Sequence, residues 1–166
     1  MKSGDQMNNS PDMPVGSKMK VTMMLADFAQ SINGKLYIMG GGWSVTGPQP
    51  CPSAIAVKIG VPWNDTNRRH ELKIELLDGD YHPVLVPTPT GNAPLVIGAN
   101  FEVGRPPGMA AGSAIDVPMA FNMGAIPLEP GRRYVWRLTI DEKTEDDWHI
   151  AFSTRPMTQP TPNVGG

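Results

Sequence analysis

The sequence predicts an all-β fold, an antiparallel β-sandwich with about nine strands and flexible tails. Short runs of alternating apolar and polar residues recur along the chain, and no segment shows the 3.6-residue apolar spacing of an amphipathic helix. Glycine and proline contribute 18 residues each to the 166, which supplies the turns that many short strands require. These two observations favour strands joined by turns over any fold that contains helices.

Asn33 and Gly34 form the clearest turn signal in the chain. Both residues adopt positive φ at little steric cost, and they separate an apolar strand expected at residues 20–28 from a returning strand at residues 36–39. We therefore expect a tight β-hairpin, in which both turn residues have a structural role.

Three successive glycines follow this hairpin. A run without Cβ atoms weakens a regular strand and marks a bulge, a sharp bend or the close approach of another group. Gly40, Gly41 and Gly42 are thus expected to bend the chain, so that Trp43 either enters the core or faces a partner. Together with Trp63 and the proline-rich loops, these residues form the candidate binding rim, because aromatic residues and exposed loops are common at binding surfaces.

The remaining strands follow the same alternation. Between residues 54 and 61, isoleucine and valine alternate with alanine, lysine and glycine, which predicts a half-buried strand. Pro118 cannot donate to a ladder, so its strand is placed at a sheet edge or beside a bulge. Further strands are expected at residues 71–76, 81–86, 95–103, 115–123, 134–140 and 148–152, with loops at residues 47–53, 87–94 and 104–113.

The run L-E-P-G-R-R-Y precedes the strand with the best alternation. A turn at Pro130 and Gly131 brings upstream backbone within reach of the Tyr134 hydroxyl, which needs a partner when it is buried. This pattern resembles the tyrosine corner of immunoglobulin-like and fibronectin type III domains. The resemblance implies an immunoglobulin-like sandwich, with structural roles for Tyr134 and for Trp136 and Trp148 in the last two strands.

The charged residues are nearly balanced, with a formal net charge of −2. Such a surface has no electrostatic footprint for nucleic acid or an anionic membrane. The single cysteine, Cys51, excludes a disulfide within the chain and a cysteine-ligated metal cluster. We therefore expect no cofactor, no metal and neither nucleic acid nor membrane as a partner.

The two ends of the chain lack strand periodicity. Residues 1–17 and 156–166 are expected to be mobile tails on either side of a sandwich domain at residues 18–155. The N-terminal residues contain no apolar core of signal-peptide length, and no apolar run reaches the roughly 20 residues of a membrane span. A location in the cytoplasm or in a virion is expected.

Motifs for catalysis are incomplete. The run G-W-S-V-T-G brings Ser44 close to the pattern of a nucleophile elbow, but Thr46 replaces its second glycine and no strand-to-helix turn is predicted. The glycine run matches neither of the common phosphate-binding loops. The acidic residues between positions 141 and 147 lack the spacing of a calcium loop and are expected to form a solvated turn. We expect no catalytic residue and no enzyme.

Other titratable residues have simpler structural interpretations. His70, His82 and His149 lack metal-ligand spacing and are expected at the surface. Asp78 and Asp80 flank a glycine, so a hairpin turn explains them better than a pair of catalytic carboxylates does.

Several segments of the first half carry a family resemblance: M-K-V-T-M-M-L-A-D-F-A-Q, N-G-K-L-Y, I-M-G-G-G-W-S-V-T-G, P-S-A-I-A-V-K-I and V-P-W. They resemble a family of small uncharacterised proteins from actinobacteria and their phages. The resemblance implies a stand-alone accessory protein with no activity to transfer.

These observations favour a non-enzymatic interaction or structural domain that acts through a protein partner. One form of it is a virion component, such as a capsid decoration or tail protein, which assembles with itself or on a lattice. The alternative is an intracellular binding module for a host protein or a small molecule, for example a counter-defence factor.

Overall fold

The computed structural model describes residues 18–158, which form twelve strands and one short 3-10 turn. The tail predicted at residues 1–17, and residues 159–166 of the second tail, lie outside the described residues. The elements are β1 (Lys20–Ala26), β2 (Phe28–Ile32), β3 (Lys35–Met39), β4 (Val45–Thr46), β5 (Ser53–Val61), η1 (Trp63–Asp65), β6 (Arg69–Asp78), β7 (Leu85–Thr88), β8 (Gly91–Pro94), β9 (Val96–Glu102), β10 (Ile115–Met123), β11 (Arg133–Ile140) and β12 (His149–Thr154).

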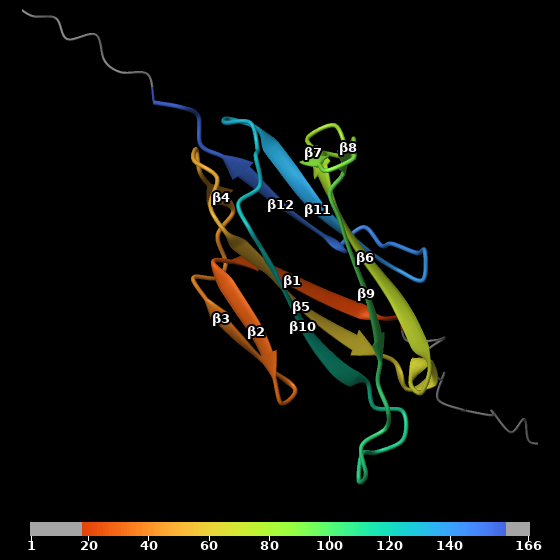
Figure 1. Ribbon diagram of the computed structural model, residues 1–166. Helices are drawn as coiled ribbons and strands as arrows, with labels where there is room; N and C mark the ends of the chain where they lie inside the picture. The colour runs from red at the N-terminus through yellow and green to blue at the C-terminus, as the bar shows by residue number, and fades with distance from the viewer. Residues whose placement is uncertain (1–17, 159–166) are drawn as a thin grey trace, which may run out of the picture.

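Two sheets pack face to face as a sandwich (Figure 1). One sheet has the order β1-β5-β10, and the other has the order β4-β12-β11-β6-β9. Neighbouring strands are antiparallel, except that β4 runs parallel to β12. In the strand naming of immunoglobulin domains, β1, β5 and β10 correspond to strands A, B and E, and β6, β11 and β12 correspond to strands C, F and G. The fold is therefore the predicted immunoglobulin-like sandwich.

The core lies between the sheets and is built from the inward positions of alternating strands. Isoleucine and valine from β5 face leucine and isoleucine from β6, and β11 adds Trp136. Burial of each such side chain contributes roughly 1.5–3 kcal/mol, which makes this layer the main source of stability. The leucine, isoleucine and tryptophan side chains that are almost wholly buried are Leu25, Ile55, Ile59, Leu72, Ile74, Leu76, Leu77, Trp136 and Leu138.

The first half of the strand predicted at residues 54–61 is buried on both faces, whereas the sequence predicted burial on one; farther along, Lys58 is exposed. The hairpin formed by β2 and β3 covers the outer face of β5, where Ala54 and Ala56 are fully buried beneath it. Alanine allows this close approach because its side chain is short. Pro118 lies on β10 at the edge of the three-stranded sheet, as predicted.

The tyrosine corner forms at the start of β11. The Glu129 N–H donates a hydrogen bond to the Tyr134 hydroxyl oxygen, with 3.0 Å between the two atoms. Gly131 supplies the positive φ of 70° that the turn requires, and its N–H donates to the Thr154 carbonyl of β12. The Tyr134 ring stacks on Phe152 with ring centroids 5.6 Å apart. The corner therefore joins the β10–β11 connection to the last two strands.

More strands form than the nine expected, and one reason is Asp27. The run predicted as one strand at residues 20–28 divides there, because the Asp27 N–H donates to the carbonyls of Met39 and Gly40 and the chain bends into β2.

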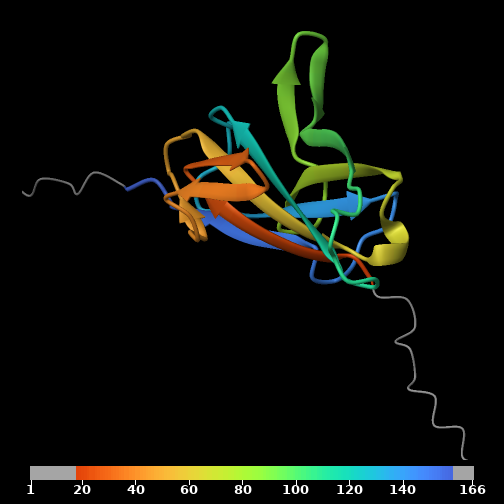
Figure 2. The same cartoon turned by 90° about the horizontal axis from the view of Figure 1, so that it is seen from below.

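A second reason is the proline-rich segment 87–94, which the sequence placed in a loop. It lies within the hairpin β7–β8, which projects from the sandwich (Figure 2). Its register pairs Pro87 with Asn92 and Leu85 with Pro94, with one further pair between them. Pro87 and Pro94 therefore belong to the same set of alternating residue pairs. When the hydrogen bonds between the strands are made by the other set, the ladder does not need the N–H groups that proline lacks.

His70 is wholly buried in β6, so its expected surface position is wrong. Its ring stacks on Phe101 with centroids 5.1 Å apart. The Nδ1 atom lies 2.7 Å from an Asp141 carboxylate oxygen, and Nε2 lies 2.8 Å from the Asp65 carbonyl oxygen. Burial is tolerated because both ring nitrogens lie within hydrogen-bond distance of a polar oxygen. One feature of the sequence does indicate this burial. His70 lies two residues before the buried Leu72, and residues two apart in a strand point to the same face.

Asp141 holds this cluster from the turn between β11 and β12. Burial raises the pKa of its carboxyl group, but hydrogen bonds from His70 and from the Glu71 N–H, together with the charges of His70 and Arg68, outweigh burial. The pKa of Asp141 therefore lies below its ordinary value of 3.8. The predicted solvated turn thus has one residue with a structural role.

Replacement of Tyr134 by Phe should lower the free energy of unfolding by about 1 kcal/mol or slightly more, since the Glu129 N–H loses its acceptor. Urea denaturation measures this change. Tyr81→Phe is the control, because Tyr81 is about half exposed. Equal stability of wild type and Tyr134→Phe would contradict a stabilising corner.

Asp141→Asn should weaken the dependence of stability on acid pH. Because the pKa of Asp141 is lowered in the folded state, its carboxylate stabilises the fold above the ordinary value of 3.8, and this contribution is lost as pH falls through the folded-state pKa. The wild-type unfolding free energy should therefore fall more steeply than that of the variant between about pH 5 and pH 2. Asp146→Asn, a substitution at an exposed position of the same turn, is the comparison variant, and parallel curves for wild type and Asp141→Asn would refute this role.

Candidate interaction surface

The hairpin β2–β3 is set by its turn. Asn33 and Gly34 have φ values of 50° and 72°, as the two central residues of a tight hairpin turn require. The ladder then pairs Ile32 with Lys35, Gln30 with Tyr37, and Phe28 with Met39. Since side chains alternate between faces, these six residues share one face of the hairpin.

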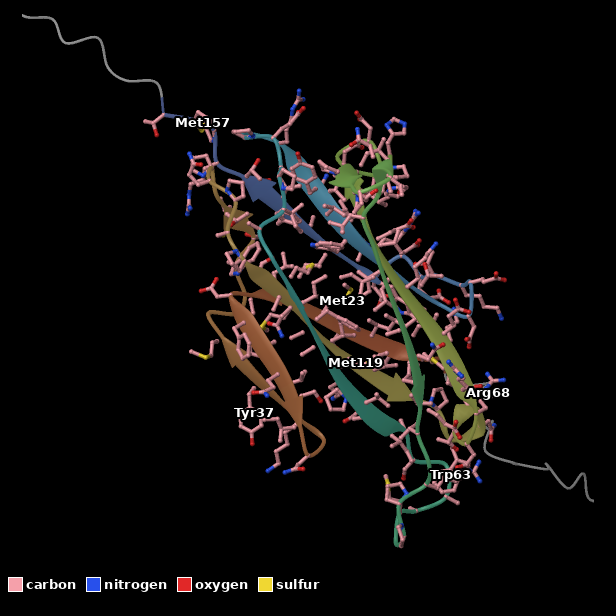
Figure 3. All side chains as sticks on the ribbon, in the orientation of Figure 1. Met23, Tyr37, Trp63, Arg68, Met119 and Met157 are labelled. Carbon is pink, nitrogen blue, oxygen red and sulfur yellow. The ribbon has the colours of Figure 1, made fainter. Side chains whose placement is uncertain are left out.

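The shared face points to solvent and is largely apolar. We call Phe28, Ile32, Tyr37 and Met39 the hairpin face; their exposed fractions are 44, 41, 53 and 66%. Tyr37 projects away from the body of the molecule (Figure 3). Met24 and Ile38 are also exposed, but they lie together near Gly41, and Ile38 belongs to the opposite face of the hairpin. Single exposed apolar side chains are ordinary, but four on one face of a hairpin, which they share with Gln30 and Lys35, make that face a candidate interaction surface.

The opposite face fixes the hairpin to the sandwich. Ala29 is wholly buried, and half-buried Leu36 packs on the same alanine cluster as Ala54 and Ala56. The Asn122 side chain on β10 completes the attachment: its Oδ1 accepts from the Ala29 N–H at 3.1 Å, and its Nδ2 donates to the Ala29 carbonyl at 2.7 Å. The hairpin is thus held by packing and by a two-point hydrogen bond.

Each of the three glycines after β3 lies where the backbone needs a positive φ or where a Cβ atom would clash. Gly40 has a φ of 59°, and a Cβ there would overlap the Asp27 carboxylate. At Gly41 a Cβ would lie 2.6 Å from an Ile38 methyl carbon. Gly42 has a φ of 88°, and its N–H donates to the Leu25 carbonyl at 2.8 Å. The glycines therefore allow the chain to return closely along the end of β1.

Trp43 packs on the core. Its ring meets Phe152 edge to face, with centroids 6.0 Å apart and planes at 87°. The indole Nε1 atom is buried and has no hydrogen-bond partner among the described residues. The ring lines a cavity of about 30 Å³ together with Cys51, Leu128 and Trp136. Trp43 is therefore mainly a core residue that retains one unpaired donor.

Trp63 lies far from Trp43. It lies two residues beyond the end of β5, whereas Ser53 at the start of β5 lines the Trp43 cavity. Nine residues of strand separate the two sites by roughly 27 Å. The Arg105 guanidinium lies 4.2 Å from the Trp63 ring centroid, which places this tryptophan against the loop at residues 104–113. The single binding rim expected from the sequence is thus two separate places.

The acidic pair Asp78 and Asp80 lies in a turn, as predicted. One Asp78 carboxylate oxygen accepts the N–H groups of Asp80 and His82 at 2.9 Å each. These bonds, chiefly the one from His82, hold the pKa of Asp78 below its ordinary value. The ligand atoms of Asp78, Asp80 and His82 lie within 4.8 Å of one another, but the turn itself accounts for this arrangement.

Sequence reasoning identified the hairpin but not its face. The outward residues are separated in the sequence by inward residues such as Ala29 and Leu36, which are also apolar, so neither strand shows a polar side. Apolar residues on both parities of a strand indicate that both faces have contacts. In β2 and β3 the sandwich supplies one of these contacts and leaves the other open.

Trp43→Ala should lower the free energy of unfolding by about 3–5 kcal/mol, because the substitution leaves a cavity against Phe152. Trp43→Phe is the matched control. It should lose much less, since it keeps an aromatic ring and removes a donor that has no partner. Unchanged stability of Trp43→Ala, measured by urea denaturation, would mean that the ring serves partner binding instead.

No helix among residues 18–158 is long and apolar enough to cross a membrane.

Comparisons with known proteins place the chain in a family. No curated protein and no solved structure matches the chain significantly. A family model does match, over residues 21–153, which span the chain from β1 into β12 and include the hairpin. The chain therefore belongs to DUF6941, a family of unknown function.

Proposed function

We propose that this chain is a non-enzymatic protein-binding domain whose contact surface is the hairpin face. The observation that carries the proposal is the exposure of Phe28, Ile32, Tyr37 and Met39 on one side of an anchored hairpin. At about half exposure, four such side chains present on the order of 400 Å² of mostly apolar surface, the size of a functional patch on a monomer.

The attachment of the hairpin supports this role. A surface that is already ordered loses little conformational entropy when a partner binds, so more of the contact energy appears as affinity. The Asn122 contacts to Ala29 and the alanine cluster fix the hairpin before any partner arrives. Aromatic residues and methionine, which are enriched at protein interfaces, make up three of its four residues.

The setting we propose is a phage or bacterial accessory protein, and a virion component in particular. The resemblance of the first half of the sequence to actinobacterial and actinophage proteins supports this setting. A sandwich that rests one anchored apolar face on a neighbouring protein suits a repeating lattice, where many identical contacts of modest area add together.

A second candidate is a binding module for a small molecule, and the unpaired Trp43 Nε1–H favours it. This donor borders the small cavity, and a larger surface hollow of about 450 Å³ shares Trp43 and Cys51 in its lining. A ligand with a carbonyl or ether oxygen would supply the missing acceptor.

The hairpin face is tested with variants on β2 alone. Phe28→Ser combined with Ile32→Ser should reduce binding at least about tenfold, since loss of a buried apolar anchor costs 1.4 kcal/mol or more. Binding is measured by quantitative co-sedimentation with purified particles of a phage that encodes the chain. The matched control is Leu85→Ser combined with Val96→Ser, two exposed apolar residues outside the hairpin.

Three outcomes separate the candidates. Loss of binding in the β2 variant alone supports the proposed face and the virion setting. Equal binding of variant and control contradicts the hairpin face. If wild-type protein is absent from particles, and a small molecule stabilises wild type but not Trp43→Phe, then the second candidate holds.

A further inference from the structure

The outer edge of β3 is open. The Ala29 N–H and C=O point away from β3, toward Asn122, so the pair Ala29–Ile38 is one of the ladder positions without hydrogen bonds between the strands. The backbone groups of Ile38 therefore point away from β2, as do those of Leu36 two residues earlier. In the described part of the chain β3 pairs with β2 alone, and no hydrogen bond uses these outward groups.

This edge differs from that of β10, which is protected. The Ser31 hydroxyl donates to the Pro118 carbonyl, and Asn122 bonds Ala29, so the hairpin itself occupies the β10 edge. On β3 the single charged residue is Lys35, at the start of the strand. An exposed, apolar and uncharged edge is a template for another strand. Figure 1 shows β3 as the outermost strand on this side of the molecule.

We propose that the β3 edge pairs with the β3 edge of a second copy of this chain, across a two-fold axis at Tyr37. This inference deepens the proposed function, and rests on it, because it joins two hairpins into one four-stranded sheet whose combined face contacts the partner. Antiparallel pairing lets Leu36 and Ile38 each exchange two backbone hydrogen bonds with Ile38 and Leu36 of the second copy.

The register is self-complementary, which favours a second copy over an unrelated strand. Tyr37 opposes Tyr37 of the second copy, Leu36 opposes Ile38, and Lys35 opposes Met39. The three central pairs are thus apolar or aromatic, and each Lys35 faces Met39 instead of the Lys35 of the other copy. An isologous interface requires this match of a surface with itself.

The contact area of two five-residue edges is small. Interfaces well below 1,000 Å² are weak or transient, so we expect a reversible dimer that forms with rising protein concentration. The dimer doubles the hairpin face to on the order of 800 Å² in one plane, close to the contribution of one partner to a stable interface.

A charge exchange at the two-fold axis tests the dimer. Tyr37→Lys and Tyr37→Glu each place like charges opposite one another, and each should raise the dimer dissociation constant at least about tenfold in sedimentation velocity. An equimolar mixture of the two should restore a dimer, because the charges then attract. Leu85→Lys, at an equally exposed site on β7, should leave the constant unchanged.

Cysteine cross-linking gives a second, independent measurement. In a Cys51→Ser background, Tyr37→Cys should form an interchain disulfide upon mild oxidation, since opposed residues at a position without hydrogen bonds lie within disulfide reach. Leu85→Cys in the same background should not. Circular dichroism verifies that each variant is folded.

Wild-type protein that stays monomeric up to its highest soluble concentration would overturn the inference, as would a dimer that Tyr37→Lys leaves intact. A monomer that instead takes an extended segment of another protein on β3 would also overturn it. None of these results depends on the Phe28 and Ile32 variants, so the hairpin face is judged separately.

Discussion

The burial of both faces of β5 in its first half is the constraint on which the rest of the structure depends. One face of this strand carries isoleucine and valine, which fill the space between the sheets, and the other carries Ala54 and Ala56. Bulky residues on the first face stabilise the sandwich through the area that they remove from water. Small residues on the second allow a separate hairpin to lie directly on the sheet. A larger side chain at Ala56 would lift the hairpin and separate Asn122 from Ala29.

This close packing explains why the hairpin presents an apolar surface in an ordered form. An isolated two-stranded hairpin is marginally stable in water, and only contact with further strands gives it a fixed structure. Here the buried face supplies that contact, and the exposed face carries the residues to which we assign partner binding in the proposed function. Successive side chains of a strand point to opposite faces, so Leu36 packs inward and Tyr37 projects outward.

The sequence predicted the features whose causes are local. Asn33-Gly34 and the tyrosine corner follow from the conformational preferences of a few neighbouring residues, and both form. The burial of His70 was not predicted, because its acceptors come from η1 and from Asp141, 71 residues away. The phase of Pro87 and Pro94 depends on a register that composition does not reveal. The hairpin face was missed for a related reason: exposure depends on which sheet covers which side.

The return of the chain at the base of the hairpin has a consequence for how this fold can vary. The Asp27 N–H bonds the Gly40 carbonyl, and the Gly42 N–H bonds the Leu25 carbonyl, so the segment between them leaves and re-enters the sandwich at one point. Beyond that point β4 joins β12 in the other sheet, whatever the hairpin contains. The hairpin is thus a closed insertion in an otherwise continuous scaffold. Its outward residues are free to diverge, or to be exchanged by design, while the two sheets and their core remain the same.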